Sequence, residues 1–257
     1  MMMTMNPTPL LEFRHVSCPL PEVEPVDDLT FSLDHGSNAV FFGMEGSGLR
    51  SLSQLILGLE KRYEGDILFQ GNTIRGLDYL GRLSYLNRIG YLHGDYGLIS
   101  NMTVEQNISL RLEYYSQLSP QEIRAVTERL MAELGILSRR SARPVELRLS
   151  EILRTAYARA VAHNPDLLIM EHALVGHSPL NIRSFMDVLE RRAAASDMSV
   201  IFITYEPQKF IDLADSFHMI YKGRLVFSGG REEFINSDNP YVAQYREASL
   251  DGPMKIE

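Results

Sequence analysis

The 257-residue chain contains a single cysteine, Cys18, so its sequence excludes a disulfide framework and a cysteine-ligated metal cluster. The chain also lacks an excess of positive charge: its 33 acidic residues outnumber its 25 lysines and arginines, and the net charge of −8 gives no electrostatic basis for a nucleic-acid partner. No apolar run approaches the roughly 18 residues of a membrane span. The start, Met1–Pro7, lacks the charged and apolar regions of a signal peptide. We therefore expect a cytosolic or membrane-peripheral protein.

The apolar segments follow strand patterns in both halves of the chain. Leu11–Val16 and Leu29–Leu33 alternate as half-buried strands do, whereas Leu167–Met170 and Val200–Ile203 are continuously apolar, as buried parallel strands are. A helix from about Leu180 to Ser196 supplies the crossover between the last two. Strands that alternate with helices predict an α/β fold with a parallel sheet and a ligand at its carboxyl edge.

The middle of the chain has a helical apolar period, from Thr103 to Leu137. Within it, Ser119 is the expected N-cap of a helix, because Pro120 follows at the first helical position and Glu122 stands three residues on. A further helix is expected from Glu151 to Ala162. Helices are thus predicted to form an inserted region of their own.

The most informative segment is the glycine-rich turn between an expected strand, Asn38–Phe42, and an expected helix, Leu49–Leu57. It matches the phosphate-binding pattern G-x-x-x-x-G-K-[ST] except at its end. Leu49 stands in the position of the lysine that contacts phosphate, and Arg50 in that of the hydroxyl that binds magnesium. The candidate nucleotide-binding residues are Gly43, Gly46, Ser47, Gly48, Leu49, Arg50 and Ser51.

The backbone of such a loop can bind an anion without any side chain, because its N–H groups point inward and the helix dipole adds partial positive charge. Leu49 removes the lysine charge, and Arg50 could replace the metal as a fixed cation or block it. A pattern shifted by one residue, with Arg50 and Ser51 as the lysine–serine pair, disagrees with the spacing of Gly46–Gly48. An ordinary strand-to-helix turn stays open as an alternative.

Several other segments, which occur in the family's order and at its spacing, resemble the ATP-binding subunit of ABC transporters over nearly the full chain. Asn164–Met170 is similar to the family's Walker B segment and Arg159–Pro165 to the helix before it. Ile89–Tyr91 and Asn101–Ile108 resemble the flanks of the glutamine loop, and Gly223–Gly229 resembles the hairpin that ends the core. The resemblance implies a P-loop NTPase (RecA-like) core with a parallel sheet, an N-terminal antiparallel β subdomain and an inserted α-helical subdomain.

The resemblance also implies a single ABC ATPase-like domain over residues 1–257. Residues 10–93 and 158–235 would form its RecA-like and β core, residues 94–157 the helical subdomain, and residues 236–257 a C-terminal tail.

The positions at which this family contacts nucleotide have changed. The adenine-stacking aromatic falls on Leu20, the glutamine-loop residue on Gly94, the Walker B aspartate on Glu171, the catalytic glutamate on His172 and the switch histidine on Tyr205. The signature falls on Leu147, Arg148, Leu149, Ser150 and Glu151, and the D-loop on Val175, Gly176, His177, Ser178 and Pro179. Arg148 and Leu149 are bulky where a phosphate must approach closely.

Each change has an ordinary alternative: a histidine such as His172 can act as a base, and a lone histidine is more often a loop residue. Together, beside strands and helices that still resemble the family, the changes predict a pseudo-ATPase with no intact catalytic residue, no bound metal, and at most weak binding of ATP and Mg²⁺. An active ATPase would require Arg50, Glu171 and His172 all to substitute for the family's residues.

The end of the chain narrows the resemblance. Asn239–Arg246 and Asp251–Pro253, with Gly94–Ile99, resemble the Mla-type, Mce-associated lipid-transport ATPases, although a generic amphipathic tail helix remains an alternative. This resemblance implies phospholipid transport at the inner face of the cytoplasmic membrane, with a permease subunit and an Mce-domain protein as partners. The aromatic loop Tyr96–Ile99 favours docking on a permease over a free regulatory or scaffold protein.

A second, intact ABC ATPase is also expected as a partner. The resemblance implies that two subunits sandwich the nucleotides, each between one chain's Walker A loop and the other's signature. A homodimer of this chain would have damaged elements in both sites, whereas a heterodimer would pair each damaged element with an intact one. We therefore expect a heterodimer in which the partner carries out the hydrolysis.

Overall fold

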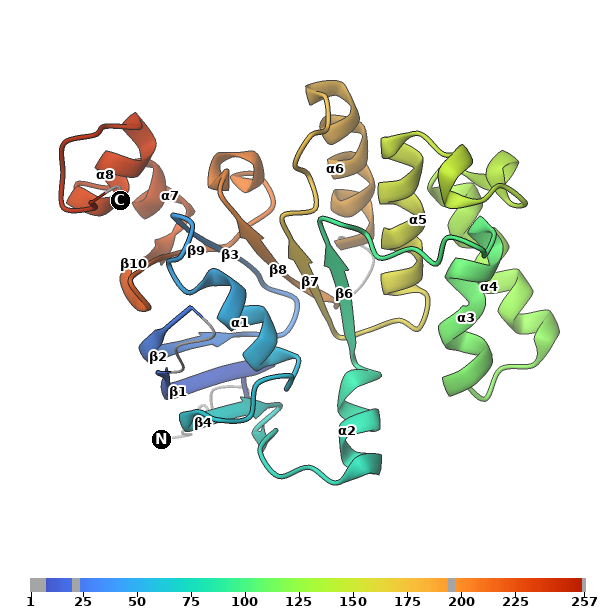
Figure 1. Ribbon diagram of the computed structural model, residues 1–257, viewed down its shortest axis with the longest axis horizontal. Coiled ribbons are helices and arrows are strands. Elements are labelled where there is room, and N and C mark those ends of the chain that lie inside the picture. Colours follow the sequence, from blue (N-terminus) through green and yellow to red (C-terminus); the bar gives the residue numbers. More distant parts are fainter. Residues whose placement is uncertain (1–7, 20–23, 194–196, 256–257) are drawn as a thin grey trace, which may run out of the picture. The chain divides into compact units, whose positions relative to one another are not determined.

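The computed structural model describes residues 8–19, 24–193 and 197–255 (Figure 1). The chain divides into two compact units, one formed by Met1–Arg82 with Ser199–Glu257 and the other by Leu83–Met198. Both units combine helices with parallel strands, which confirms the predicted α/β class.

An antiparallel sheet forms the N-terminal part of the first unit. Its strand order is β2-β1-β4-β5, and the strands are β1 (Leu11–Cys18), β2 (Val26–Leu33), β4 (Glu64–Phe69) and β5 (Asn72–Thr73). Alternate residues of β2 are buried, as the alternating apolar pattern predicted. Phe13 and Phe31 stack across the β1–β2 pair with ring centroids 4.5 Å apart. The predicted antiparallel β subdomain is therefore present.

The first unit also contains parallel strands. β3 (Asn38–Gly43) pairs in parallel with β8 (Ser199–Thr204) on one side and β9 (Ser216–Tyr221) on the other. β10 (Arg224–Gly230) runs antiparallel to β9. Every residue of β3 and β8 is buried, which explains their continuously apolar sequences. Helix α1 (Leu49–Ile56) follows β3, and a 3₁₀ turn, Pro207–Phe210, follows β8.

Two short helices, α7 (Arg231–Ile235) and α8 (Pro240–Glu247), close the first unit beyond β10, as the red end of the ribbon shows (Figure 1). Phe234 stacks on Phe217 with centroids 4.3 Å apart, and Phe42 meets Tyr245 edge-on at 5.4 Å. Helices α7 and α8 are therefore packed into the first unit through Phe234 and Tyr245, respectively.

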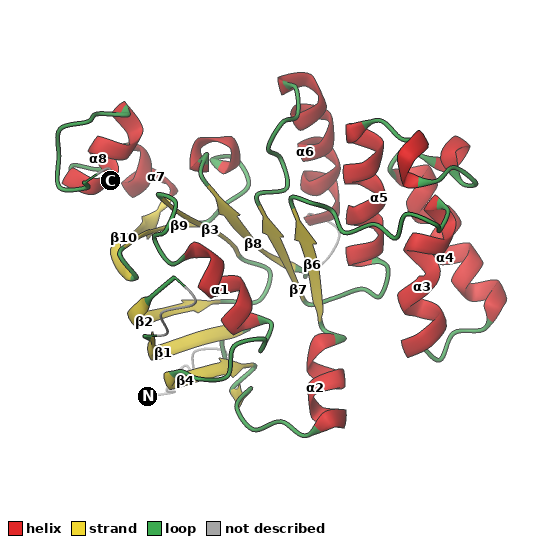
Figure 2. Ribbon diagram, in the orientation of Figure 1, coloured by secondary structure: helices red, strands yellow, loops and turns green. Residues whose placement is uncertain are grey.

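The second unit consists of two parallel strands and a group of helices. β6 (Ile89–His93) pairs with β7 (Leu167–Glu171). Figure 2 shows three helices gathered in one bundle: α3 (Val104–Tyr115), α4 (Pro120–Glu133) and α5 (Leu149–Val161). Helix α6 (Pro179–Ala193) follows β7, and α2 (Tyr79–Leu86) lies across the boundary between the two units.

Helices α3 and α4 each begin with a capping box. Ser119 accepts a hydrogen bond from the Glu122 amide at 3.3 Å, and the Glu122 carboxylate accepts the Ser119 amide at 2.7 Å. Thr103 forms the same reciprocal pair with Gln106 ahead of α3. The predicted start at Ser119 is therefore confirmed as a capping box. No helix in the described part of the chain is long and apolar enough to cross a membrane.

Candidate nucleotide site

The loop between β3 and α1 has the tight backbone that its glycines predicted. Gly46 and Gly48 have φ angles of 75° and 111°, a region that favours glycine. A β-carbon on Gly43 would lie 2.2 Å from the carbonyl oxygen of Ile220, so only glycine fits there. The loop therefore turns closely from the end of β3 into the first residue of α1.

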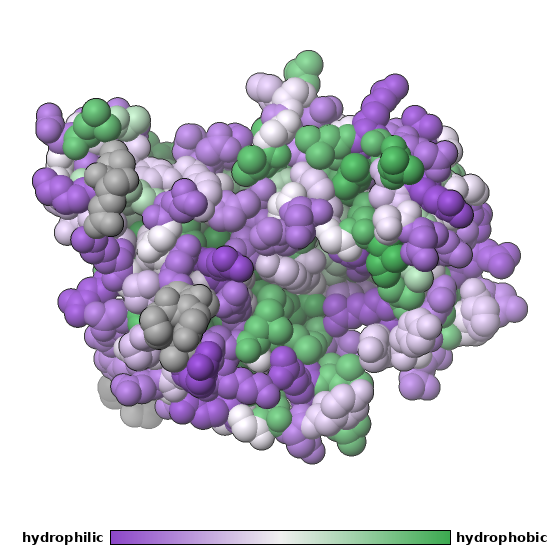
Figure 3. Space-filling view, viewed as in Figure 1, coloured by the Kyte–Doolittle hydropathy of each residue, from purple (hydrophilic) through white to green (hydrophobic). Residues whose placement is uncertain are grey.

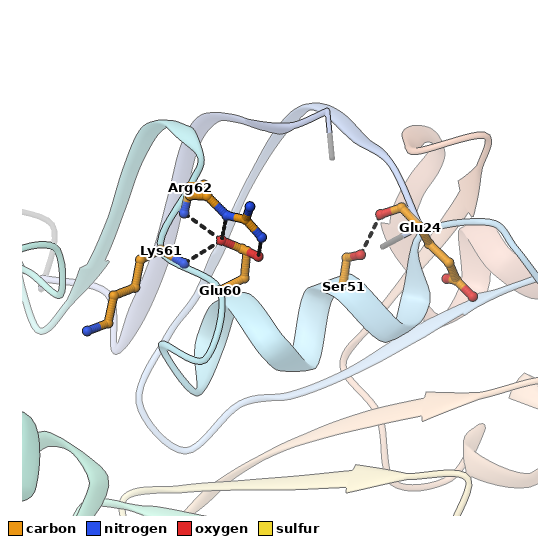
Figure 4. Close-up of polar contacts among 5 residues, drawn as sticks. All are labelled: Glu24, Ser51, Glu60, Lys61 and Arg62. Atoms are coloured by element: carbon orange, nitrogen blue, oxygen red, sulfur yellow. Dashed lines mark hydrogen bonds and ion pairs between the residues drawn. The ribbon is translucent and has the colours of Figure 1, made fainter. Parts of the chain in front are cut away.

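The amide groups of this loop bind a carboxylate of the chain itself. Glu24 lies just before β2, and its Oε2 accepts hydrogen bonds from the amides of Gly48 at 2.9 Å and Arg50 at 3.3 Å. The Ser51 hydroxyl donates to the backbone carbonyl oxygen of Glu24, as the close-up shows (Figure 4). An internal anion thus caps the N-terminus of α1, where a helix favours negative charge.

The two replaced residues of the loop differ in their environment. Leu49 is only 3% exposed, so its side chain is part of the core, whereas the Arg50 side chain is exposed. The Ser47 hydroxyl is buried and has no hydrogen-bond partner among the described residues. The loop therefore holds no buried cation at the lysine position.

Tyr205, the expected switch position, lies in the first unit with the loop. Its carbonyl oxygen accepts a hydrogen bond of 2.7 Å from the Tyr245 hydroxyl, which also lies 3.1 Å from the carbonyl oxygen of Gly43. Burial raises the pKa of Tyr245. One tyrosine of α8 thus links the segments after β3 and β8. Leu20, the expected adenine position, lies outside the described residues.

In the second unit, the carboxylate at the expected Walker B position is engaged by a tyrosine. Glu171 ends β7 and is 3% exposed, and the Tyr91 hydroxyl of β6 donates to its Oε2 at 2.6 Å. The next residue, His172, has a left-handed backbone with φ of 52°. A β-carbon on Gly94 already lies 2.8 Å from the His172 carbonyl oxygen, so a glutamine side chain does not fit there without a shift.

A second tyrosine joins the loop after β6 to the loop after β7. Tyr96 is buried, and its hydroxyl donates to the carbonyl oxygen of Ala173 at 3.1 Å and lies 2.7 Å from Nε2 of His177. Burial raises the pKa of Tyr96. Arg159 of α5 donates to the carbonyl oxygens of Tyr96 and Gly97, each at 2.6 Å. The glutamine-loop and D-loop positions are therefore tied together.

The signature-like segment, Leu147–Glu151, forms the start of α5. The Arg148 amide donates to the Glu151 carboxylate at 2.8 Å, and Arg139 donates to the same group at 2.9 Å. These partners, the Arg148 amide first, lower the pKa of Glu151. Ser150 is the second residue of the helix, and Ser178 lies directly before α6, with its hydroxyl 3.4 Å from the amide of Asn181.

Leu149, at the first position of α5, is half-exposed and lies next to the D-loop position. A β-carbon on Gly176, whose φ is 80°, would lie 3.9 Å from the Leu149 side chain. An isobutyl side chain thus lies at the start of α5 beside the loop that contains Gly176.

The residues present do not fit a magnesium–nucleotide complex. In the first unit, the lysine position is a buried leucine and the loop amides bind Glu24. In the second unit, taken by itself, the Glu171 carboxylate accepts the Tyr91 hydroxyl. Among the described residues, no group of three or more His, Cys, Asp or Glu side chains could hold a metal ion. No step of nucleotide hydrolysis follows from this arrangement.

Comparison with known proteins identifies the family. The family model described as "ABC transporter" matches residues 26–174, more than half of the chain. The chain belongs to the ABC transporter family. The resemblance drawn from the sequence motifs is thereby confirmed.

Individual ABC proteins match most of the chain. An ABC protein named intermembrane phospholipid transport system ATP-binding protein MlaF, from Haemophilus influenzae, is 23% identical over 231 residues, which cover 90% of this chain and 88% of MlaF. The methionine import ATP-binding protein MetN 1 of Rhodococcus jostii is 28% identical over 80% of this chain and 61% of its own length. The solved structure of cbiO1 from Clostridium perfringens superposes with a TM-score of 0.81 at 20% identity and covers 90% of this chain, which shows the fold.

Several contacts of these residues could not be found from the sequence. Glu24 belongs to no motif. Tyr91, Tyr96 and Tyr245 lie in segments that the resemblance singled out, but it did not indicate their partners, and Tyr96 of the expected docking loop is buried against His177. The turn between β3 and α1, by contrast, could be predicted from the sequence, because the spacing of its glycines is typical of such a turn.

Proposed function

We propose that this ABC protein is a nucleotide-binding-domain subunit that has lost hydrolysis and acts as the structural partner of an intact ATPase. The observation that carries this proposal is Leu49, which fills the lysine position with a side chain only 3% exposed. No conformation of a leucine side chain can supply a positive charge at the lysine position. A histidine with a left-handed backbone at the catalytic position, His172, supports the same conclusion.

Phospholipid is the cargo that the comparisons support best. MlaF is matched over 88% of its length, whereas MetN 1 and the glycine betaine/carnitine transport protein GbuA of Listeria monocytogenes are matched over 61% and 56%. The C-terminal segments Asn239–Arg246 and Asp251–Pro253 resemble the Mla-type ATPases as well. This subunit would therefore work on the inner face of the cytoplasmic membrane, with an Mce-domain protein as a further partner.

A groove in the second unit is the proposed docking surface for the permease. It has a volume of about 500 Å³ and is lined by Tyr91, Leu110, Arg111, Tyr114, Tyr115, Arg159 and Ala160. Tyr114 and Tyr115 are 74% and 53% exposed at the end of α3. Burial lowers the pKa of Arg111 and Arg159. Exposed aromatic rings around charged groups suit a cytoplasmic segment of a permease that carries apolar and acidic side chains.

A separate apolar surface of the second unit is proposed to face the partner ATPase. Figure 3 shows apolar side chains over the upper ends of α5 and α6. The exposed residues of this surface are Val145, Leu149, Val175 and Leu180. They occupy or flank the signature and D-loop positions, so the pairing of subunits would depend on apolar contact where other members rely on nucleotide.

Co-purification tests both contacts of this proposal. The transporter should contain this chain together with a permease and a second, different ATPase. The double variant Tyr114→Ala/Tyr115→Ala should lose the permease, whereas Tyr79→Ala, which truncates an equally exposed tyrosine of α2, should retain it. A complex with two copies of this chain and no other ATPase would contradict the heterodimer. Recovery of the chain alone, with no permease, would favour a free regulatory protein.

A further inference from the structure

We propose that Glu24 is the resident anion of the phosphate loop and excludes external phosphate groups from it. The carboxylate oxygen that bridges the amides of Gly48 and Arg50 occupies the place to which a phosphate loop directs its N–H groups. The proposal rests on the proposed loss of nucleotide hydrolysis and adds the cause of weak nucleotide binding.

The segment that carries Glu24 is fixed by backbone hydrogen bonds through Gly223 to the phosphate loop. The Asp27 amide donates to the carbonyl oxygen of Gly223 at 2.9 Å, and the Gly223 amide donates to the carbonyl oxygen of Ser47 at 2.8 Å. The Asp27 carboxylate also pairs with Arg224 at 2.5 Å. The chain before β2, the hairpin turn after β9 and the phosphate loop therefore form one junction, and Glu24 enters the loop from it.

Two glycines allow this segment to lie directly on the loop. A β-carbon on Gly48 would lie 2.7 Å from the carbonyl oxygen of Pro25, and one on Gly223 would lie 2.6 Å from the same atom. Both have positive φ angles, 111° and 81°. The backbone next to Glu24 thus approaches the loop as closely as a ligand would.

Among the described residues, Glu24 is the acidic side chain that accepts the amides at the start of this helix. The first turn of α1 contains no acidic residue, and Gly48 at the N-cap makes no side-chain hydrogen bond. The amides of the first turn lack partners within the helix and attract negative charge. Glu24 supplies that charge from 24 residues earlier in the chain, so an incoming phosphate must first displace it.

This competition has a measurable size. A ligand that binds only the open loop has its affinity reduced by the fraction of molecules in which the loop is open. If the charged hydrogen bonds of Glu24 hold nine in ten or more of the molecules closed, removal of the carboxylate should tighten binding by about tenfold or more.

Inorganic pyrophosphate is the probe for the loop, and calorimetric titration of the full chain is the measurement. Glu24→Ala should bind pyrophosphate about tenfold more tightly than the wild type or better. Glu24→Gln should be intermediate, because a neutral amide oxygen still accepts the N–H groups but without charge assistance. Glu45→Ala is the matched control, since Glu45 is an exposed carboxylate of the same loop and its removal changes the net charge equally.

Equal gains in Glu24→Ala and Glu45→Ala would overturn the proposal, because the effect would then be general electrostatics. No gain in Glu24→Ala, with the variant folded, would overturn it as well. If either outcome occurs and the wild type does not hydrolyse ATP, only the role of Glu24 is refuted and the proposed function is not. Conversely, a wild type that hydrolyses ATP would refute the proposed function whatever the variants do.

Hydrogen exchange on the unchanged protein keeps the proposal testable if Glu24→Ala does not fold. Without any anion present, the amides of Gly48 and Arg50 should already be protected, because Glu24 accepts both. Fast exchange at both amides that slows only after pyrophosphate is added would show an open loop and overturn the proposal.

Discussion

Restoring the phosphate loop should recover nucleotide binding only when Glu24 is removed as well. The relevant variant combines Leu49→Lys, Arg50→Ser and Glu24→Ala, and its partner for comparison is the double variant that keeps Glu24. The first two substitutions return the phosphate cation and the metal-binding hydroxyl. The third frees the amides of Gly48 and Arg50.

The structure sets the expected magnitudes. Leu49 is 3% exposed, and burial of a leucine contributes about 1.5–3 kcal/mol, of which the lysine stem recovers part. The double variant should therefore lose about 1–2 kcal/mol of unfolding free energy. Hydrogen bonds to charged groups are worth about 1.5–3 kcal/mol, so the triple variant should bind Mg-ATP roughly ten- to a hundredfold more tightly than the double variant.

Calorimetric titration with Mg-ATP, after urea denaturation has shown that both variants fold, is the assay. Neither variant should gain turnover, because no carboxylate base stands at His172. Equal affinities in the double and triple variants would refute the idea that Glu24 competes with phosphate. A loss of all binding in both would mean that the pocket is closed by other residues.

Three further predictions concern stability. Phe234→Ala removes a ring stacked 4.3 Å from Phe217 and should lower the unfolding free energy by about 3–5 kcal/mol in urea denaturation. Ile235→Ala, which truncates an exposed neighbour, is the control, and an equally large loss there would contradict the aromatic packing of α7. Burial lowers the pKa of His218 to about 4, so its contribution to stability, present above the unfolded pKa of 6.5, should fall by up to roughly 1.4 kcal/mol per pH unit between 6.5 and 4. Burial also lowers the pKa of His163 to about 4, so His218→Asn should make the slope of stability against pH shallower without abolishing it. Gly94→Gln should lower the melting temperature without any gain in nucleotide binding, because its β-carbon meets a backbone oxygen at 2.8 Å; an unchanged melting temperature would contradict this.

Local patterns predicted most of the fold. The expected strand Asn38–Phe42 became β3, and the serine–proline–glutamate start at Ser119 became a capping box. Both features depend on residues within a few positions of one another, so a short stretch of sequence is enough to predict them. The expected helix Glu151–Ala162 begins two residues earlier, at Leu149, because Arg148 and Glu151 form its cap.

Contacts between distant segments could not be predicted in this way. Glu24 reaches the loop only because the register of β2 and the turn at Gly223 bring it there, and no motif describes that path. The Tyr91–Glu171 hydrogen bond likewise depends on the pairing of β6 with β7. The sequence therefore showed which residues differ from the family's motifs, whereas the structure showed that the loop amide of Gly48 contacts Glu24 and that Glu171 contacts Tyr91.

Phosphate release by the purified chain with Mg-ATP tests the central claim most directly. The account predicts no release above the buffer rate, because Leu49 leaves the loop without its cation, and no change on His172→Ala, because the proposed function gives His172 no role as a base. Sustained release by the wild type that disappears in His172→Ala would contradict the account and identify the chain as an active ATPase with unusual catalytic residues.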